Sequence, residues 1–174
     1  MDFKELIEIR RSVRGYKAAA TKEDVASILT MAAQAPSWKN LQPARTYAVV
    51  SEEGVAKFAR ALPSFNRQSS AGAALLVTTF VKEQSGFSAG EPDNDGGDLW
   101  GAYDLGLRDA YLVLAASDMG FDTLIMGIRD ADEIRNILNI PENEQIMSVI
   151  ALGKRTAEPI ARPRKPLDET VKFF

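Results

Sequence analysis

One segment, Ala74 to Val81, limits what this chain can fold into more than any other. Its sequence, ALLVTTFV, is apolar or β-branched at every position and does not alternate with charged residues. A strand with this pattern is buried on both of its faces. We therefore expect a mixed α+β fold, in which helices pack on a central sheet that contains this strand.

Helical patterns precede and follow this strand along the chain. Apolar residues from Phe3 to Ile9 indicate a short amphipathic helix that runs into a group of arginines, with Gly15 placed to stop it. Thr21 and Asp24 resemble a capping box, which begins a second helix that ends before Pro36. The other expected elements are strands over 46–50 and through Ile146, Val149 and Leu152, helices over 52–62 and 99–119, a tight connection at 120–123 (GFDT), and a short helix capped by Asp130 and Glu133.

Three further segments have a distinctive composition. The later part of the long helix, AYLVLAAS, is apolar on all sides and must be covered all round, for which a second subunit is one source. Residues 82–98 are rich in Gly and Asp and predict a mobile surface loop. Residues 154–174 hold six Lys or Arg against three Asp or Glu, with three prolines, and predict an extended basic tail.

Length and composition set the broad class of the protein. With 174 residues, 45% of them apolar, the chain can bury one sizeable core but not two, so we expect residues 1–174 to form a single domain. There is no Cys and no His, which excludes thiol nucleophiles, Ser-His-Asp triads and Cys/His zinc sites. If the protein is an enzyme, a borrowed cofactor is the simplest source of the reactive group.

The charge balance gives no general attraction to polyanions. The net charge of −3 favours neither nucleic acid nor an anionic membrane as a partner. The charged N-terminus, MDFKELIEIRR, does not resemble a signal peptide, and no apolar run approaches the roughly 20 residues of a membrane span. We expect a cytoplasmic protein without nucleic-acid or membrane partners.

Arginines at both ends of the chain are candidate phosphate ligands. Arg10 and Arg14 share a face if the first helix persists, and Arg162 and Arg164 alternate with Pro163, so that both point the same way from an extended chain. The alternatives are a solvated helix end, whose cations complement the helix dipole, and a solvated tail. The residues alone leave both interpretations open.

Two other polar segments carry candidate chemistry. The stretch APSWKNLQPAR places Ser37, Lys39, Asn40, Gln42 and Arg45 in an irregular loop between prolines, which suits a polar heterocycle or is an ordinary helix-to-strand loop with Trp38 in the core. EPDNDGGD has three of the EF-hand ligand spacings, but Asp98 stands where that loop needs Gly. We therefore expect no metal site.

The order of these pieces resembles the nitroreductase family. RRSVRGY lies near the start, APSWKNLQP follows the second helix, and ARPRKP lies near the end, so the resemblance spans nearly the whole chain. LPSFNRQSSAGAALLV is similar to the family segment that brings an Asn to the flavin, and GFDTLIMG to the loop beside the flavin ring. The resemblance implies a central, mostly antiparallel sheet flanked by helices, with a C-terminal extension exchanged across a homodimer.

The resemblance also implies FMN ligands, which fall into three groups. Those implied for the phosphate and the pyrimidine edge are Arg10, Arg11, Ser12, Arg14, Arg162 and Arg164. Those implied at the ring are Asn66, Met126 and Gly127. The loop implied to come from the partner subunit holds Pro36, Ser37 and Trp38, with Asn40 and Gln42 as further cofactor-binding candidates. Family members of typical size insert helices over the flavin where this chain has only residues 82–98. Phe65, Phe87 and Trp100 are candidates for an aromatic wall of the pocket.

The implied activity is that of an FMN-dependent oxidoreductase without a catalytic side chain of its own. NADH or NADPH reduces FMN, which then reduces a nitroaromatic, a quinone or a similar small acceptor by ping-pong turnover. Arg14 and Lys39 are candidates to stabilise the negative charge of the reduced flavin. The alternatives are a reductive dehalogenase or flavin-processing enzyme on the same scaffold, a non-catalytic flavin-binding module, and a dimer without flavin.

Overall fold

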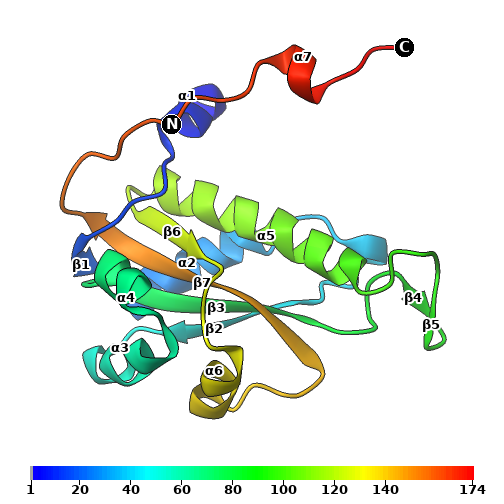
Figure 1. The fold of residues 1–174 in the computed structure, drawn as a ribbon, viewed down its shortest axis with the longest axis horizontal. Helices are drawn as coiled ribbons and strands as arrows, with labels where there is room; N and C mark the ends of the chain where they lie inside the picture. Colours follow the sequence, from blue (N-terminus) through cyan, green and yellow to red (C-terminus); the bar gives the residue numbers. More distant parts are fainter. Residues whose placement is uncertain (1) are drawn as a thin grey trace.

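A five-stranded antiparallel sheet forms the centre of the protein in the computed structural model, which describes residues 2–174 (Figure 1). The strand order is β1-β7-β3-β2, and β6 pairs with β7. The strands are β1 (Tyr16–Ala19), β2 (Ala44–Val49), β3 (Ala74–Val81), β6 (Asp122–Met126) and β7 (Glu144–Arg155). A separate hairpin consists of β4 (Phe87–Ser88) and β5 (Glu91–Pro92).

Helices cover both faces of this sheet. The helices of residues 2–174 are α1 (Phe3–Ile9), α2 (Lys22–Ala32), α3 (Glu52–Phe58), α4 (Ser64–Ser70), α5 (Leu99–Asp118), α6 (Ala131–Leu138) and α7 (Leu167–Thr170), of which α7 does not contact the sheet. Short 3-10 turns lie at Trp38–Asn40 and Ala59–Ala61. The predicted α+β class with a mostly antiparallel sheet is confirmed. Among residues 2–174, no helix is long and apolar enough to cross a membrane.

The strand β3 joins the two hydrophobic cores, as its apolar sequence predicts. Leu75 and Val77 pack into a core with α3 and α6, while Ala74 and Leu76 pack into a second core with α2 and α5. Figure 1 shows these helices on opposite sides of the sheet. Side chains on both faces of β3 are therefore removed from water, which is the main source of stabilisation for a layered fold.

The strand β7 is the longest in the sheet and pairs with three others. It contacts β3 along most of its length, β6 over residues 149–153 and β1 over residues 153–155. Gly153 lies where β1 crosses closely, because a Cβ there would be 2.4 Å from the carbonyl oxygen of Ala18. Only glycine fits at this position without moving the backbone.

The structure differs from the sequence expectations around β6. Residues 122–126 form a strand, not only the tight connection that GFDT suggested. The first helix ends at Ile9, and Arg10 is extended (φ −60°, ψ 127°), so Arg10 and Arg14 do not share a helical face. The reason is pairing: the Val13 amide donates to the Thr123 carbonyl (3.0 Å), and Ser12 forms a parallel bridge with Thr123. Residues 12 and 13 therefore lie along the edge of β6.

The N-terminal segment and the start of the tail lie side by side, since residues 10–14 and 157–164 line one pocket, whereas the C-terminus lies away from the N-terminus (Figure 1). Lys154 and Arg155 belong to β7, and the tail begins after them. From there it passes α1 and extends away from the body, with only the short α7 inside it (Figure 1). Ile160 and Phe173 in the tail are 80% and 85% exposed. The tail is therefore extended as predicted, and its apolar side chains are not covered by their own chain.

Candidate functional site

Arginines from both ends of the chain line one pocket, which we call the basic pocket. Its volume is about 490 Å³. Residues 10–14 form one wall as they run along β6, and the start of the tail forms the other. The candidate phosphate ligands that meet here are Arg10, Arg11, Ser12, Arg14, Arg162 and Arg164. The structure therefore brings together two groups that are about 150 positions apart in the sequence.

The protein balances only part of the positive charge of the basic pocket. Glu158 lines the pocket beside its five arginines but pairs with Arg155 (2.7 Å), and within residues 2–174 none of the five has an ion pair with a carboxylate. Burial lowers the pKa of Arg10, and the charges of Arg164 and Arg11 lower it further. Cations that repel one another in this way are suited to a ligand with more than one negative charge, such as a phosphate group.

The far end of β6 carries the residues expected at a flavin ring. Asn66, on α4, is only 8% exposed, and its Nδ2 donates to the carbonyl of Ile128 (2.7 Å). Gly127 is exposed, and a Cβ there would meet nothing within 4 Å. Met126 is 3% exposed, and its side chain belongs to the core. Residue 126 can therefore face a ligand through its backbone only.

Local sequence explains how α4 holds Asn66. Pro63 precedes the helix and provides the extended residue at its start. Ser70, one turn after Asn66, donates its hydroxyl to the Asn66 carbonyl (2.8 Å) and is buried. The exposed Arg67 and Phe65 lie on the same helix, with Phe65 52% exposed. Asn66 is thus fixed at the end of β6, roughly 10 Å along that strand from the Ser12 bridge.

The segment from Pro36 to Gln42, which we call the Trp38 loop, is rigid and irregular. Lys39, Asn40 and Gln42 all have positive φ angles (48°, 57° and 50°). The Ser37 hydroxyl accepts a hydrogen bond from the Gln42 amide (2.9 Å), and the Trp38 amide donates to Asp104 Oδ2 (2.9 Å). Hydrogen bonds on both sides therefore hold a conformation that non-glycine residues rarely adopt.

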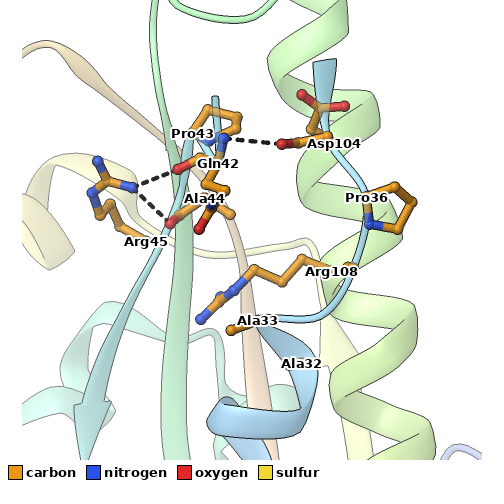
Figure 2. A pocket seen from close by; sticks show the side chains of 11 residues that line it. Ala32, Ala33, Pro36, Gln42, Pro43, Ala44, Arg45, Asp104 and Arg108 are labelled. Atoms are coloured by element: carbon orange, nitrogen blue, oxygen red, sulfur yellow. Dashed lines mark hydrogen bonds between the residues drawn. The ribbon is translucent and has the colours of Figure 1, made fainter. Parts of the chain in front are cut away.

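A small pocket of about 230 Å³ lies between the Trp38 loop, the end of α2 and α5 (Figure 2). Arg108 extends from α5 into this pocket, and its Nη1 donates to Thr46 Oγ1 (2.6 Å). Burial lowers the pKa of Arg108. Arg45 lies at the other side and donates to the carbonyls of Gln42 and Ala44. These contacts fix the backbone on which the Trp38 loop stands.

Within one chain, the Trp38 loop and the basic pocket lie at opposite ends of α5. Asp104, near the start of α5, holds the loop. Ser117, near its end, shares a surface hollow with Ile9, the residue before Arg10. At 1.5 Å per residue, Asp104 and Ser117 are roughly 20 Å apart along the helix. The candidate site residues therefore form two groups in a single chain, not one.

The two candidate charge stabilisers are in different situations. Arg14 is exposed in the basic pocket. Lys39 is bound at the other end of α5, where its Nζ lies 3.1 Å from Asp93 Oδ2 and 3.1 Å from Ser88 Oγ. In one chain, Arg14 is therefore available to an anion at the basic pocket, whereas Lys39 is neutralised by the hairpin.

Two buried acids on α5 were not anticipated from the sequence. Asp104 is 4% exposed and accepts hydrogen bonds from Trp38 and Ser85. Asp109 is 8% exposed and accepts from Thr78 (3.0 Å), and burial raises the pKa of its carboxyl to about 6. The sequence signal that could have identified them is the presence of two acidic residues within a long and mostly apolar helix. Among residues 2–174, no group of three or more acids is arranged to hold a metal ion.

Comparison with known proteins identifies the family to which this chain belongs. The family model described as "Nitroreductase family" matches residues 7–154. "Putative NAD(P)H nitroreductase MhqN" of Bacillus subtilis is 28% identical over 99% of both chains. An Archaeoglobus fulgidus protein, "Putative NADH dehydrogenase/NAD(P)H nitroreductase", is 30% identical and covers 86% of this chain and 83% of its own.

Solved structures with the same fold include two that cover nearly the whole chain. A nitroreductase family protein from Streptococcus pneumoniae has a TM-score of 0.84 at 20% identity, over 99% of this chain and 100% of its own. A "putative nitroreductase in complex with FMN" from Exiguobacterium sibiricum has a TM-score of 0.81 at 23% identity, over 100% and 98%. The arrangement of strands and helices is therefore shared along the full length of this chain.

Proposed function

Since the chain belongs to the nitroreductase family, we propose that it is an FMN-dependent oxidoreductase. NADH or NADPH is the electron donor, and a small aromatic molecule such as a nitroaromatic or a quinone is the acceptor. The two substrates use one pocket in turn, which gives ping-pong turnover. When bound, FMN would carry two electrons from the donor to the acceptor.

The observation that carries this proposal is the convergence of unpaired arginines in the basic pocket. Arg10, Arg162 and Arg164 approach a common space from two segments, with no acid of residues 2–174 paired to them. Such a site fits the phosphate of FMN, since each arginine can make charge-assisted hydrogen bonds to its oxygens. A dinucleotide is a poorer fit, because no glycine-rich pyrophosphate loop follows a strand.

The residues along β6 fit the remainder of the cofactor. Asn66 has an amide oxygen and a second N–H beyond the bond that it gives to Ile128. Gly127 leaves open space beside the backbone. Arg14, in the same segment as Arg10, is placed to stabilise negative charge that develops on a bound ring. With no His in the chain, protons come from solvent.

We further propose that the site is completed in a homodimer. The Trp38 loop and the basic pocket lie roughly 20 Å apart along α5, so one chain cannot bring them to the same small molecule. A two-fold axis near the middle of α5 would place the loop of one subunit beside the basic pocket of the other. Gly106, on an exposed face of α5, has no atom within 4 Å of its added Cβ, which permits close approach of a second backbone.

The test is the visible spectrum and the flavin content of the purified protein. We expect yellow protein with about one FMN per chain, bleached by NADH or NADPH without oxygen. The double variant Arg162→Ala and Arg164→Ala should bind FMN roughly two to four powers of ten more weakly, since two charge-assisted bonds are lost. The control, Lys165→Ala with Lys172→Ala, removes the same charge from the tail outside the pocket and should bind normally.

Release of FAD, or colourless protein that takes up no FMN, would contradict the proposal. Equal weakening by the arginine and lysine double variants would show that the tail acts through its overall charge. In that case the basic pocket would not be a phosphate site.

A further inference from the structure

Residues 83–98, which we call the hairpin segment, are fixed to the Trp38 loop and to α5. Lys39 binds both Asp93 and Ser88 of the hairpin. The Ser85 hydroxyl donates to Asp104 Oδ2 (2.6 Å), the same oxygen that accepts the Trp38 amide. The mobile loop expected here is thus a structured element that shares a buried acid with the Trp38 loop.

The glycines of the hairpin segment make room for one indole. A Cβ at Gly86 would lie 2.7 Å from Trp100, and a Cβ at Gly96 would lie 2.8 Å from its Nε1. Both distances are too short for a side chain. The indole N–H of Trp100 donates to Asn94 Oδ1 (2.8 Å). The Gly-rich composition that suggested mobility instead fixes the ring of Trp100.

Three aromatic rings contact one another in a row, in tilted and edge-on pairs, and we call them the aromatic ladder. Trp38 and Trp100 have ring centroids 4.7 Å apart at 51°, and Trp100 and Tyr103 have centroids 5.7 Å apart at 69°. Tyr103 is 60% exposed, and Leu99, one turn earlier on α5, is 73% exposed. Within residues 2–174, the Tyr103 hydroxyl has no hydrogen-bond partner. The aromatic ladder therefore ends at the exposed ring of Tyr103, whose hydroxyl is available to a ligand and whose inner side contacts Trp100.

We propose that Tyr103, supported by the aromatic ladder, is the specificity-determining wall on which the aromatic electron acceptor of the proposed reaction stacks. This inference rests on the proposed function, since it places the Trp38 loop and its ladder at the partner's flavin. A ring presents the flat surface that best matches Tyr103, and stacked aromatic pairs contribute about 0.5–1.5 kcal/mol beyond burial. A nitro or quinone oxygen can accept a hydrogen bond from the Tyr103 hydroxyl.

The test compares acceptors in the variant Tyr103→Leu, which keeps apolar bulk but removes the ring. We expect kcat/KM for a nitrobenzoate and a naphthoquinone to fall roughly two- to tenfold, which corresponds to loss of the stacking contribution. With ferricyanide, which has no ring to stack, the rate should be unchanged. FMN content should also be unchanged. Tyr103→Phe should retain the stacking part of the effect and lose only the hydroxyl part.

Tyr111→Leu is the matched control, because Tyr111 is a second exposed tyrosine on α5, outside the ladder. An equal loss with ferricyanide, or an equal loss in the control, would overturn the proposal in favour of a structural role. Binding of the naphthoquinone is followed separately by quenching of tryptophan fluorescence. If the wild type is not reduced by NADH or NADPH but the quinone still binds in a Tyr103-dependent way, the proposed activity fails while the aromatic site stands. Absence of binding to the wild type would remove the aromatic site itself.

Discussion

The basic pocket at one end of α5 is built from extended chain, whereas the Trp38 loop at the other end is held by hydrogen bonds to the hairpin segment and α5. In the pocket, the arginines of the tail are exposed, and burial and like charges lower the pKa of Arg10. At the loop, Asp104 is almost fully buried and satisfied by two donors. Flexible cations can close around an anion when it arrives, while a preorganised loop loses little entropy on binding.

Removing residues 162–174 tests the flexible end most severely. We expect the truncated protein to lose FMN and to sediment as a monomer. The hydrogen bonds within residues 162–174 are local to α7 and its flanks, and apolar side chains such as Leu167 and Phe173 are uncovered in one chain. The control removes only residues 166–174, which keeps the arginines and should retain part of the FMN affinity. An intact yellow dimer after the larger truncation would show that the tail is merely solvated.

Asp109 lies on α5 between the Trp38 loop and the basic pocket. Its substitution tests how a buried carboxyl on this helix affects the stability of the protein. Burial raises the pKa of its carboxyl from 3.8 to about 6. The folded state therefore favours the protonated form of Asp109. The contribution of this residue to the free energy of unfolding is greatest below about pH 4 and declines as the pH rises from about 4 to above 6. The full decline is about 3 kcal/mol.

The variant Asp109→Asn should lack most of this decline, because its amide keeps an acceptor for Thr78 and carries no charge. Urea unfolding at pH 5 and pH 8, with FMN saturating, measures the difference. If both proteins lost the same stability between these pH values, Asp109 would not be the group responsible.

The variant Asn66→Ala tests whether the buried amide at the end of β6 takes part in FMN binding together with the basic pocket. We expect FMN to bind roughly fivefold more weakly and its reduction potential to change, with the dimer intact, since about 1 kcal/mol of hydrogen bonding is lost. Titration against a reference dye measures the potential. Arg67→Ala, an exposed neighbour on α4, is the control. A potential and affinity like those of the wild type would remove Asn66 from the site.

Asp93→Asn probes the rigid end with the smallest expected effect. It breaks the ion pair with Lys39, whose side chain is 57% exposed, so the global stability of the protein should change little. Hydrogen exchange of residues 83–98 should nevertheless become faster, because the hairpin loses a tie to the Trp38 loop. Unchanged exchange in these residues would mean that the glycine cradle of Trp100 is sufficient to hold the segment.

Sequence patterns predicted the elements whose state is decided locally. The strand Ala74–Val81 and the capping box of Thr21 and Asp24 are observed as expected. The strands β1 and β6 were missed because they are short, and only pairing with β7 makes them extended. The buried acids Asp104 and Asp109 could not be identified, since burial depends on packing between distant segments.

The candidate site was predictable to a similar degree. The family resemblance marked the arginines that meet in the basic pocket, and the nitroreductase family is confirmed. It did not show that Met126 faces the core, because a residue's orientation follows the register of β6 against β7. The hairpin segment was misjudged for a related reason. Its glycines indicate flexibility when taken alone, but in the fold they surround Trp100.

The position of β7 in the chain affects how the protein folds as it is synthesised. Its three partner strands are all translated before it, and β1 pairs with β7 across more than 130 intervening residues. The sheet therefore cannot close until the last part of the chain is available, and contacts of such long range slow folding. Until then, β3 has an unpaired and apolar edge, which is prone to aggregation. Slow, late closure of the sheet, sensitive to chaperones, is the expected folding behaviour of this topology.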